Sequence, residues 1–345
     1  MLTIAAATTV GAAAVHQAQR RFNPVVELLA QRKSVFGLYA PRLPRGGRGA
    51  AQAGTAGGTG GAMPPAAASV NSVAPPKTPA ELAKDAVDYT LSDFVFDGSM
   101  EPPESFDRAF SNFTDFVNGM AAANPLARTP MLRMTHPLFL KTPIIAADPK
   151  LAGDRIARQL NLGVSGVVFV GVESADEVKQ GLSMMRFKSK GGTRPDDVGH
   201  APAYWGMSQN EYKEKADVWP LNPNGELVNF TIVESKEGLK HVREIAAVRG
   251  IGVLFPGAGT LGGVFSTVDS ATGRRMRDSV AWEGAIQQVL AACKEFNVPC
   301  GYPANANDIE KRMHQGFSVF VINWGEMGFK AVDIGRKVAG RTDTP

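Results

Sequence analysis

The chain has 345 residues, of which 44% are hydrophobic and 20% charged, and it contains 37 glycines and 23 prolines. This composition is typical of a globular protein. The net charge of +4 comes without a basic stripe interleaved with aromatic residues, so we expect no nucleic-acid partner. An α/β barrel of about 250 residues with insertions would fit this length as a single domain.

The chain begins with an Ala-rich apolar run at 1–19, followed by Arg20 and Arg21. This run is too short and too weakly apolar to span a membrane, so we expect no membrane partner. It resembles the hydrophobic part of a secretory signal, although it lacks the positive region that should precede it. We therefore expect 1–33 to be a signal or export remnant, separate from a barrel domain at 34–345. A cytoplasmic and a periplasmic location both stay open.

The first predicted strand spans 34–40 and ends at Pro41. A segment rich in Gly, Ala and Pro follows at 42–76. Its composition cannot bury a core, so we predict a disordered loop there. Thr78 then has the features of a helix N-cap, because Pro occupies the first helical position and Glu81 lies in the first turn.

Short apolar runs alternate with helical patterns along the rest of the chain, as expected for βα units. A capping box at 174–177 begins the helix after the fourth strand. The further predicted strands are 93–97, 130–134, 166–172, 227–233, 252–255, 299–302 and 317–322. The other predicted helices are 104–123, 148–162, 236–248, 277–296, 307–315 and 326–338. Eight such units predict a (β/α)₈ TIM barrel; an open doubly wound sheet is the alternative, but no GxGxxG follows the first strand.

Two further features bear on the architecture. A long insertion at 188–224, after the fourth strand and its helix, carries Tyr204, Trp205, Tyr212 and Trp219. It could form a lid over the barrel mouth or a subunit contact, or pack onto its own barrel. The cysteines at 293 and 300 have no metal-ligand spacing; we favour buried free thiols, with a disulfide as the alternative in an oxidising compartment.

Active sites of TIM barrels form at the carboxyl ends of the strands, which selects a short set of candidates. A cluster of carboxylates with one arginine suits an anionic oxo acid held on a divalent cation, and arginine would clamp the substrate's oxyanion or carboxylate. The candidates at or just after the predicted strand ends are Asp97, Glu101, Arg133, His136, Glu234, Gly257, Gly259, Thr260 and Trp324. We expect the glycines, Thr260 and Trp324 to contact substrate.

Four stretches resemble the HpcH/HpaI aldolase and citrate lyase family: 130–133 (PMLR), 155–171 (RIARQLNLGVSGVVFVG), 231–234 (TIVE) and 245–257 (IAAVRGIGVLFPG). The resemblance implies a TIM barrel, a small-molecule carboxylate substrate and a homo-oligomer. By the same resemblance Arg133 would be the catalytic arginine. Glu234 would be a ligand of Mg²⁺ or Mn²⁺.

The sequence departs from the family pattern at two places. Thr260 occupies the position of the family's second carboxylate ligand, and 99–101 (SME) replaces a motif that carries a catalytic histidine. A proton carrier would then have to come from His136, Glu101 or Asp97.

We therefore expect a carbon–carbon lyase of aldolase type that acts on a 2-oxo acid or related carboxylate through a metal-stabilised enolate. One alternative is a barrel with an altered site that serves as a binding or scaffold protein. Another is a metal-independent lyase or hydrolase that uses the carboxylates alone.

Overall fold

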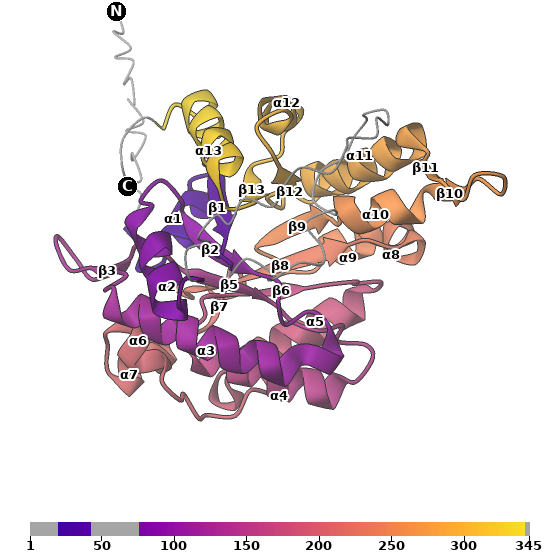
Figure 1. Ribbon diagram of the computed structural model, residues 1–345. Coiled ribbons are helices and arrows are strands. Elements are labelled where there is room, and N and C mark those ends of the chain that lie inside the picture. The colour runs from indigo at the N-terminus through magenta and orange to yellow at the C-terminus, as the bar shows by residue number, and fades with distance from the viewer. Residues whose placement is uncertain (1–19, 43–75, 342–345) are drawn as a thin grey trace, which may run out of the picture.

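The computed structural model describes residues 20–42 and 76–341 (Figure 1). The apolar run at 1–19 and all but the two end residues of the predicted loop at 42–76 lie outside these ranges. Within the described ranges no helix is long and apolar enough to cross a membrane.

The centre of the fold is a curled sheet of parallel strands. Its strands are β1 (Val35–Tyr39), β2 (Phe94–Asp97), β5 (Leu138–Lys141), β6 (Gly166–Phe169), β8 (Leu227–Val233), β9 (Val253–Pro256), β12 (Gly301–Ala304) and β13 (Val319–Ile322). They pair in the order β12-β13-β1-β2-β5-β6-β8, with β9 beside β8. A single bridge between Leu254 and Cys300 joins β9 to β12. The sheet is therefore of the TIM-barrel type and not an open doubly wound sheet.

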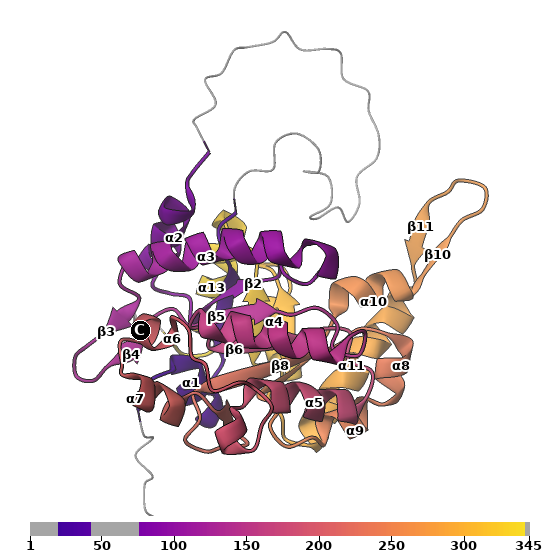
Figure 2. The ribbon, with the colours of Figure 1, turned by 90° about the horizontal axis from the view of Figure 1, so that it is seen from below.

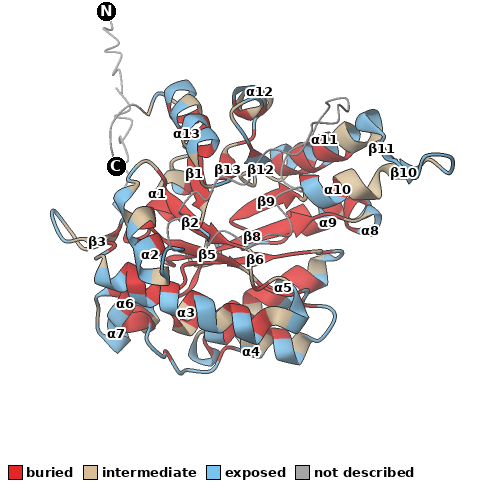
Figure 3. Ribbon diagram, viewed as in Figure 1, coloured by how far each residue is buried: buried red, intermediate tan, exposed pale blue. Residues whose placement is uncertain are grey.

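Helices follow the strands and cover the outer face of the sheet, with their buried sides turned inward (Figure 3). Thr78 caps its helix through the complete capping box that the sequence predicts. Ser174 also accepts a hydrogen bond from the Glu177 backbone, whereas the Glu177 carboxylate accepts from the backbone of Glu173. The helices are α2 (Pro79–Asp88), α3 (Phe106–Ala122), α4 (Pro149–Asn161), α5 (Ala175–Met185), α8 (Lys236–Lys240), α9 (Val242–Ala246), α10 (Ala258–Val264), α11 (Ser279–Glu295), α12 (Ile309–Gln315) and α13 (Glu326–Val338).

Side-chain alternation along each strand separates two hydrophobic cores. In β5, Leu138 and Leu140 belong to the core between the sheet and its helices, and Phe139 belongs to the core inside the barrel. A short helix, α1 (Pro24–Ala30), places Val25 and Val26 in that inner core. Because α1 packs beside the first residues of the strands, it closes the amino-terminal end of the barrel.

Phenylalanine rings fill the barrel interior, and strand glycines make room for them. A side chain at Gly37 would place its Cβ 2.1 Å from the ring of Phe94, and one at Gly166 would place it 2.0 Å from Phe139. The rings of Phe94 and Phe139 lie 4.7 Å apart, centroid to centroid. The interior is therefore packed solid below the carboxyl ends of the strands.

The third barrel strand differs from the prediction. It is β5, at Leu138–Lys141, whereas the predicted strand at 130–134 contains only β4 (Arg133–Met134), which pairs with β3 (Leu126–Ala127) outside the barrel. A strand covered on both faces needs consecutive apolar residues. The first three residues of β5 are fully buried, whereas Arg133 is only partly buried.

The aromatic insertion lies at the amino-terminal end of the barrel. It contains η2 (Lys188–Lys190), α6 (Ala201–Trp205), α7 (Gln209–Lys215) and β7 (Val218–Trp219). Trp205 is fully buried and donates a hydrogen bond to the carbonyl of Gly163, just before β6. The lid hypothesis is therefore wrong, because the insertion joins the end of a helix to the start of a strand. Its aromatic side chains pack onto their own barrel.

Cys293 and Cys300 form a disulfide, so the free-thiol interpretation is also wrong. The bond ties α11 to the residue just before β12. Away from the barrel, β10 (Ser266–Val268) and β11 (Arg275–Arg277) form a hairpin that projects beyond α10 (Figure 2). A short 3₁₀ helix, η1 (Pro103–Ser105), precedes α3.

Candidate active site

A cavity of about 190 Å³ opens at the carboxyl ends of the barrel strands. Its walls are largely apolar and include Phe96, Phe230 and Phe255. The polar side chains that line it are those of Tyr39, Lys141, Glu234 and Thr260. The cavity thus combines one cation and one carboxylate in apolar surroundings, which is the usual composition of a small-molecule site.

Glu234 follows β8 and is held by the backbone around it. Its Oε1 accepts a hydrogen bond of 2.9 Å from the backbone nitrogen of Gly171. Its Oε2 lies against Gly257, where an added Cβ would come within 2.6 Å of this oxygen. The same added Cβ would lie 2.4 Å from the Glu234 Cβ, so a side chain at this position would displace Glu234.

Lys141 is the last residue of β5 and supplies the positive charge of the cavity. Strand alternation places it on the same face as Phe139, toward the barrel interior. Its Nζ lies 2.7 Å from Oε2 of Glu101, and its side chain is only 15% exposed. Glu101 is therefore connected to the cavity by its ion pair with Lys141, which lines it.

Tyr39 ends β1 and packs edge-on against Phe96, with ring centroids 4.9 Å apart. Burial raises the pKa of Tyr39, although the charges of Lys141 and Arg42 act in the opposite direction. Its hydroxyl therefore keeps its proton at neutral pH, and it can serve the cavity as a hydrogen-bond donor.

Asp97 lies beside the cavity and not in it. As the residue after Phe96 it points to the outer face of the sheet, where it lines a separate cavity of about 470 Å³ beside α3. Its Oδ1 accepts a 2.7 Å hydrogen bond from the backbone of Ser99. Asp97 thus shapes the turn that carries Glu101.

Of the residues predicted to contact substrate, some line the cavity and one lies outside it. Gly257, Gly259 and Thr260 all line the cavity. The indole ring of Trp324 instead packs edge-on against Phe329, with centroids 5.1 Å apart, and against Tyr89 at 6.0 Å. The structure therefore places Trp324 in a packing cluster beside α13.

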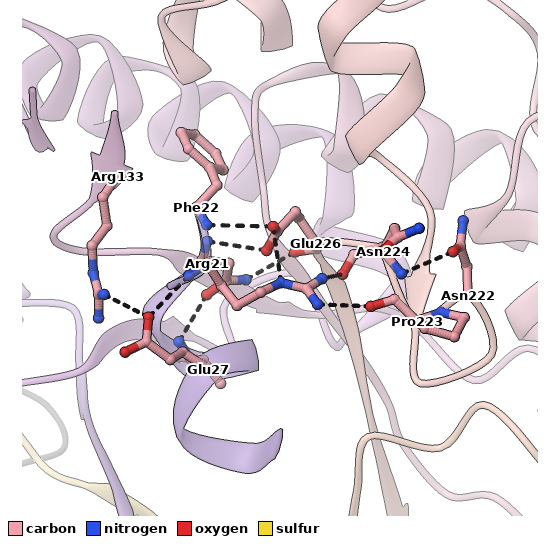
Figure 4. Close-up of polar contacts among 11 residues, drawn as sticks. Arg21, Phe22, Glu27, Arg133, Asn222, Pro223, Asn224 and Glu226 are labelled. Carbon is pink, nitrogen blue, oxygen red and sulfur yellow. Dashed lines mark hydrogen bonds and ion pairs between the residues drawn. The ribbon is translucent and has the colours of Figure 1, made fainter. Parts of the chain in front are cut away.

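Arg133 and His136 lie at the opposite end of the barrel from the cavity. Arg133 donates a 2.7 Å hydrogen bond to Glu27 of α1, as Figure 4 shows. His136 is buried, and its Nε2 lies 3.2 Å from the carbonyl of Tyr89, which leads toward β2. The prediction that these two residues follow a strand end is wrong, because the true strand begins after them.

Lys141 and Tyr39 are the site residues that the sequence analysis missed. Both stand at the ends of strands, and Lys141 directly precedes Thr142 and Pro143. Once the third strand is placed at Leu138–Lys141, its carboxyl end identifies Lys141 as the basic residue of the site.

The donor set of the cavity does not fit a resident divalent metal. Glu234 is the only carboxylate among the described residues that line it, and one of its oxygens already accepts from Gly171. Thr260 offers a neutral hydroxyl, and the Lys141 ammonium would repel a dication. Nowhere in the described ranges do three or more His, Cys, Asp or Glu side chains come together as a metal site.

Comparison with known proteins agrees with the geometry of the fold. A sequence profile of the HpcH/HpaI aldolase/citrate lyase family matches residues 80–325. No match is found among curated protein sequences.

Several solved structures share the fold. An HpcH/HpaI aldolase/citrate lyase family protein from Burkholderia cenocepacia J2315 superposes with a TM-score of 0.59 at 18% identity, covering 87% of this chain and 92% of its own. An HpcH/HpaI aldolase from Desulfitobacterium hafniense DCB-2 gives 0.56 at 14% identity, covering 92% and 96%. Macrophomate synthase gives 0.54 at 14% identity, covering 93% and 89%. At these identities the likeness shows the fold.

Proposed function

Starting from the fact that this chain belongs to the HpcH/HpaI aldolase/citrate lyase family, we propose that it is a carbon–carbon lyase of aldolase type. Its substrate is a small 2-oxo acid, bound in the cavity of Lys141 and Glu234. The observation that carries the proposal is the convergence of these two opposite charges, from β5 and β8, on one apolar cavity at the carboxyl ends of the strands.

The two charges suit the two demands of the reaction. When the bond between C3 and C4 of a 2-oxo acid breaks, its electrons move toward the C2 carbonyl, where a fixed positive charge stabilises them. Lys141 supplies that charge. The departing fragment becomes a carbonyl by losing its hydroxyl proton, and Glu234 accepts that proton.

This mechanism differs from the metal-stabilised enolate that the family resemblance implies. The residues of the cavity do not fit the Mg²⁺ or Mn²⁺ that the resemblance assigns to Glu234, and the reaction proposed here has no step that uses a metal. Assembly into a homo-oligomer stays a prediction, which light scattering on the purified chain tests.

The test is cleavage of 4-hydroxy-2-oxo acids by the purified chain in the presence of EDTA, with pyruvate release as the readout. We expect Glu234→Gln to lower kcat/KM by roughly 100-fold or more, because an amide cannot take up the proton. The matched control is Glu173→Gln, because Glu173 follows β6 but lines a different cavity. Absence of cleavage of every oxo acid, with and without added Mg²⁺, would favour a binding protein instead.

A further inference from the structure

We propose that Lys141 acts covalently, by forming an imine with the carbonyl carbon of the 2-oxo acid. This inference rests on the proposed function and specifies how the same cavity holds the electrons of the broken bond. The positive charge near C2 would then belong to the substrate itself, as an iminium ion.

The position of Lys141 is suited to attack on a bound carbonyl. Its side chain passes over Gly98, where an added Cβ would lie 3.3 Å from the lysine Cδ. From there it lines the cavity beside the apolar rings of Phe96 and Phe230. Lysine in an apolar pocket is a suitable nucleophile toward carbonyl substrates.

Glu101 provides the proton acceptor that the amine needs. An ammonium group is not nucleophilic, and Lys141 must lose a proton before it attacks. The Glu101 carboxylate lies 2.7 Å from its Nζ. Glu101 is itself about one-third exposed, so it can pass this proton on to water.

The residues that line the cavity also favour an imine over a metal-bound enolate. A metal-bound enolate needs a dication to hold the electrons, but Thr260 and the Lys141 ammonium make the site poor for one. An iminium ion is an equivalent electron acceptor that uses only an amine already present.

The sequence of bonds is as follows. The Lys141 amine adds to C2, and loss of water leaves a protonated imine. The C3–C4 bond then breaks, its electrons form an enamine with the imine, and Glu234 takes the hydroxyl proton of the leaving carbonyl fragment. Protonation at C3 and addition of water to C2 release the shorter 2-oxo acid and the free lysine. No oxidant or reductant is required.

Reductive trapping tests the proposal directly. The full chain is incubated with pyruvate and sodium cyanoborohydride, and its peptides are analysed by mass spectrometry. We expect the Lys141 peptide to gain the mass of pyruvate plus two hydrogens minus water. Lys141→Arg keeps the charge but cannot form this adduct, so it should lose both the adduct and the cleavage activity. Lys179→Arg, at an exposed position on α5, is the matched control.

The outcomes separate the two proposals. If Lys141→Arg still cleaves oxo acids, the imine is overturned and the lyase stands. If the wild-type chain is trapped at Lys141 but cleaves nothing, the imine stands and the proposed reaction fails. Labelling of exposed lysines to the same extent in both chains, with none at Lys141, would overturn the imine. Thermal melting checks that each variant is folded.

A second variant tests the proton acceptor. Glu101→Gln should slow trapping at a fixed pH, because the amine then has no carboxylate 2.7 Å away to take up its proton. Glu104→Gln, at an exposed position of η1, should leave the rate of trapping unchanged. An unchanged rate in Glu101→Gln would remove Glu101 from the mechanism.

Discussion

His136 shows how a buried histidine can be explained without a catalytic role. Since only a ring N–H can bond to a carbonyl, Nε2 donates to Tyr89 and Nδ1 accepts from the Thr135 hydroxyl at 2.8 Å. Burial lowers the pKa of His136, although the Tyr89 carbonyl and the charge of Asp93 act in the opposite direction. The folded state therefore holds this ring neutral.

This arrangement predicts a loss of stability in acid. In the unfolded chain the ring has a pKa of about 6.5 and takes up a proton below that pH, whereas the folded state resists protonation. The stabilisation is therefore present above pH ~6.5 and is lost as the pH falls below it. Urea unfolding at pH 8 and pH 5.5 should show a smaller acid loss in His136→Gln than in wild type. The same pH dependence in His136→Gln as in His314→Gln, at an exposed position, would contradict this.

At the scale of the elements, the barrel depends on a match between large rings and glycines on neighbouring strands. The Phe139 ring occupies the space that a side chain at Gly166 would need, and Phe255 does the same at Gly301. At these positions the glycine on one strand leaves room for the ring on its neighbour. The pairing of Phe139 with Gly166 across β5 and β6 is an example.

Gly166→Ala should therefore lower the free energy of unfolding. The added methyl group would force the Phe139 ring from its place, and overpacking of this kind costs about 1–3 kcal/mol. Chemical denaturation measures the loss. Gly284→Ala, at an exposed position of α11 where a Cβ meets nothing within 4 Å, is the matched control and should be neutral or stabilising. Equal stability of the two variants would show that the ring can move freely.

At the scale of the molecule, the start of the described chain is joined to Glu226, between the insertion and β8. Glu226 is almost fully buried, and it accepts hydrogen bonds from the Arg21 side chain at 3.2 Å and the Asn23 backbone at 3.1 Å (Figure 4). Burial raises the pKa of Glu226, although Arg21 and these backbone donors lower it in part. The segment that leads into α1 is therefore connected to the residue before β8 at the amino-terminal end of the barrel.

Arg21→Ala would leave the buried Glu226 carboxylate without its cation. Glu226 keeps its backbone donors, and the loss of a hydrogen bond to a charged group costs roughly 1.5–3 kcal/mol. Arg20→Ala removes a neighbouring exposed arginine and should change the free energy of unfolding little. If urea unfolding gives the same midpoint for both variants, the network around Glu226 does not stabilise the fold.

Much of this fold could be predicted from local patterns. The predicted strand at 227–233 and the helix at 326–338 coincide with β8 and α13, and the N-caps at Thr78 and Ser174 are confirmed. Glu234 was found because it follows the predicted strand at 227–233 and because 231–234 resembles a stretch of the family. These features depend on side-chain periodicity and on hydrogen bonds within one turn, which residues close in sequence determine by themselves.

Other features depended on contacts between distant segments. Two short apolar stretches, 130–134 and 138–141, compete to be the third strand, and only pairing of Leu138–Lys141 with β2 and β6 selects the second. That choice moves Arg133 and His136 to the base of the barrel and brings Lys141 to its mouth. The sequence by itself thus determined the kind and order of the elements, because those follow from local periodicity. The tertiary structure decided which charges meet in the cavity, because the end of a strand is set by the register of its neighbours.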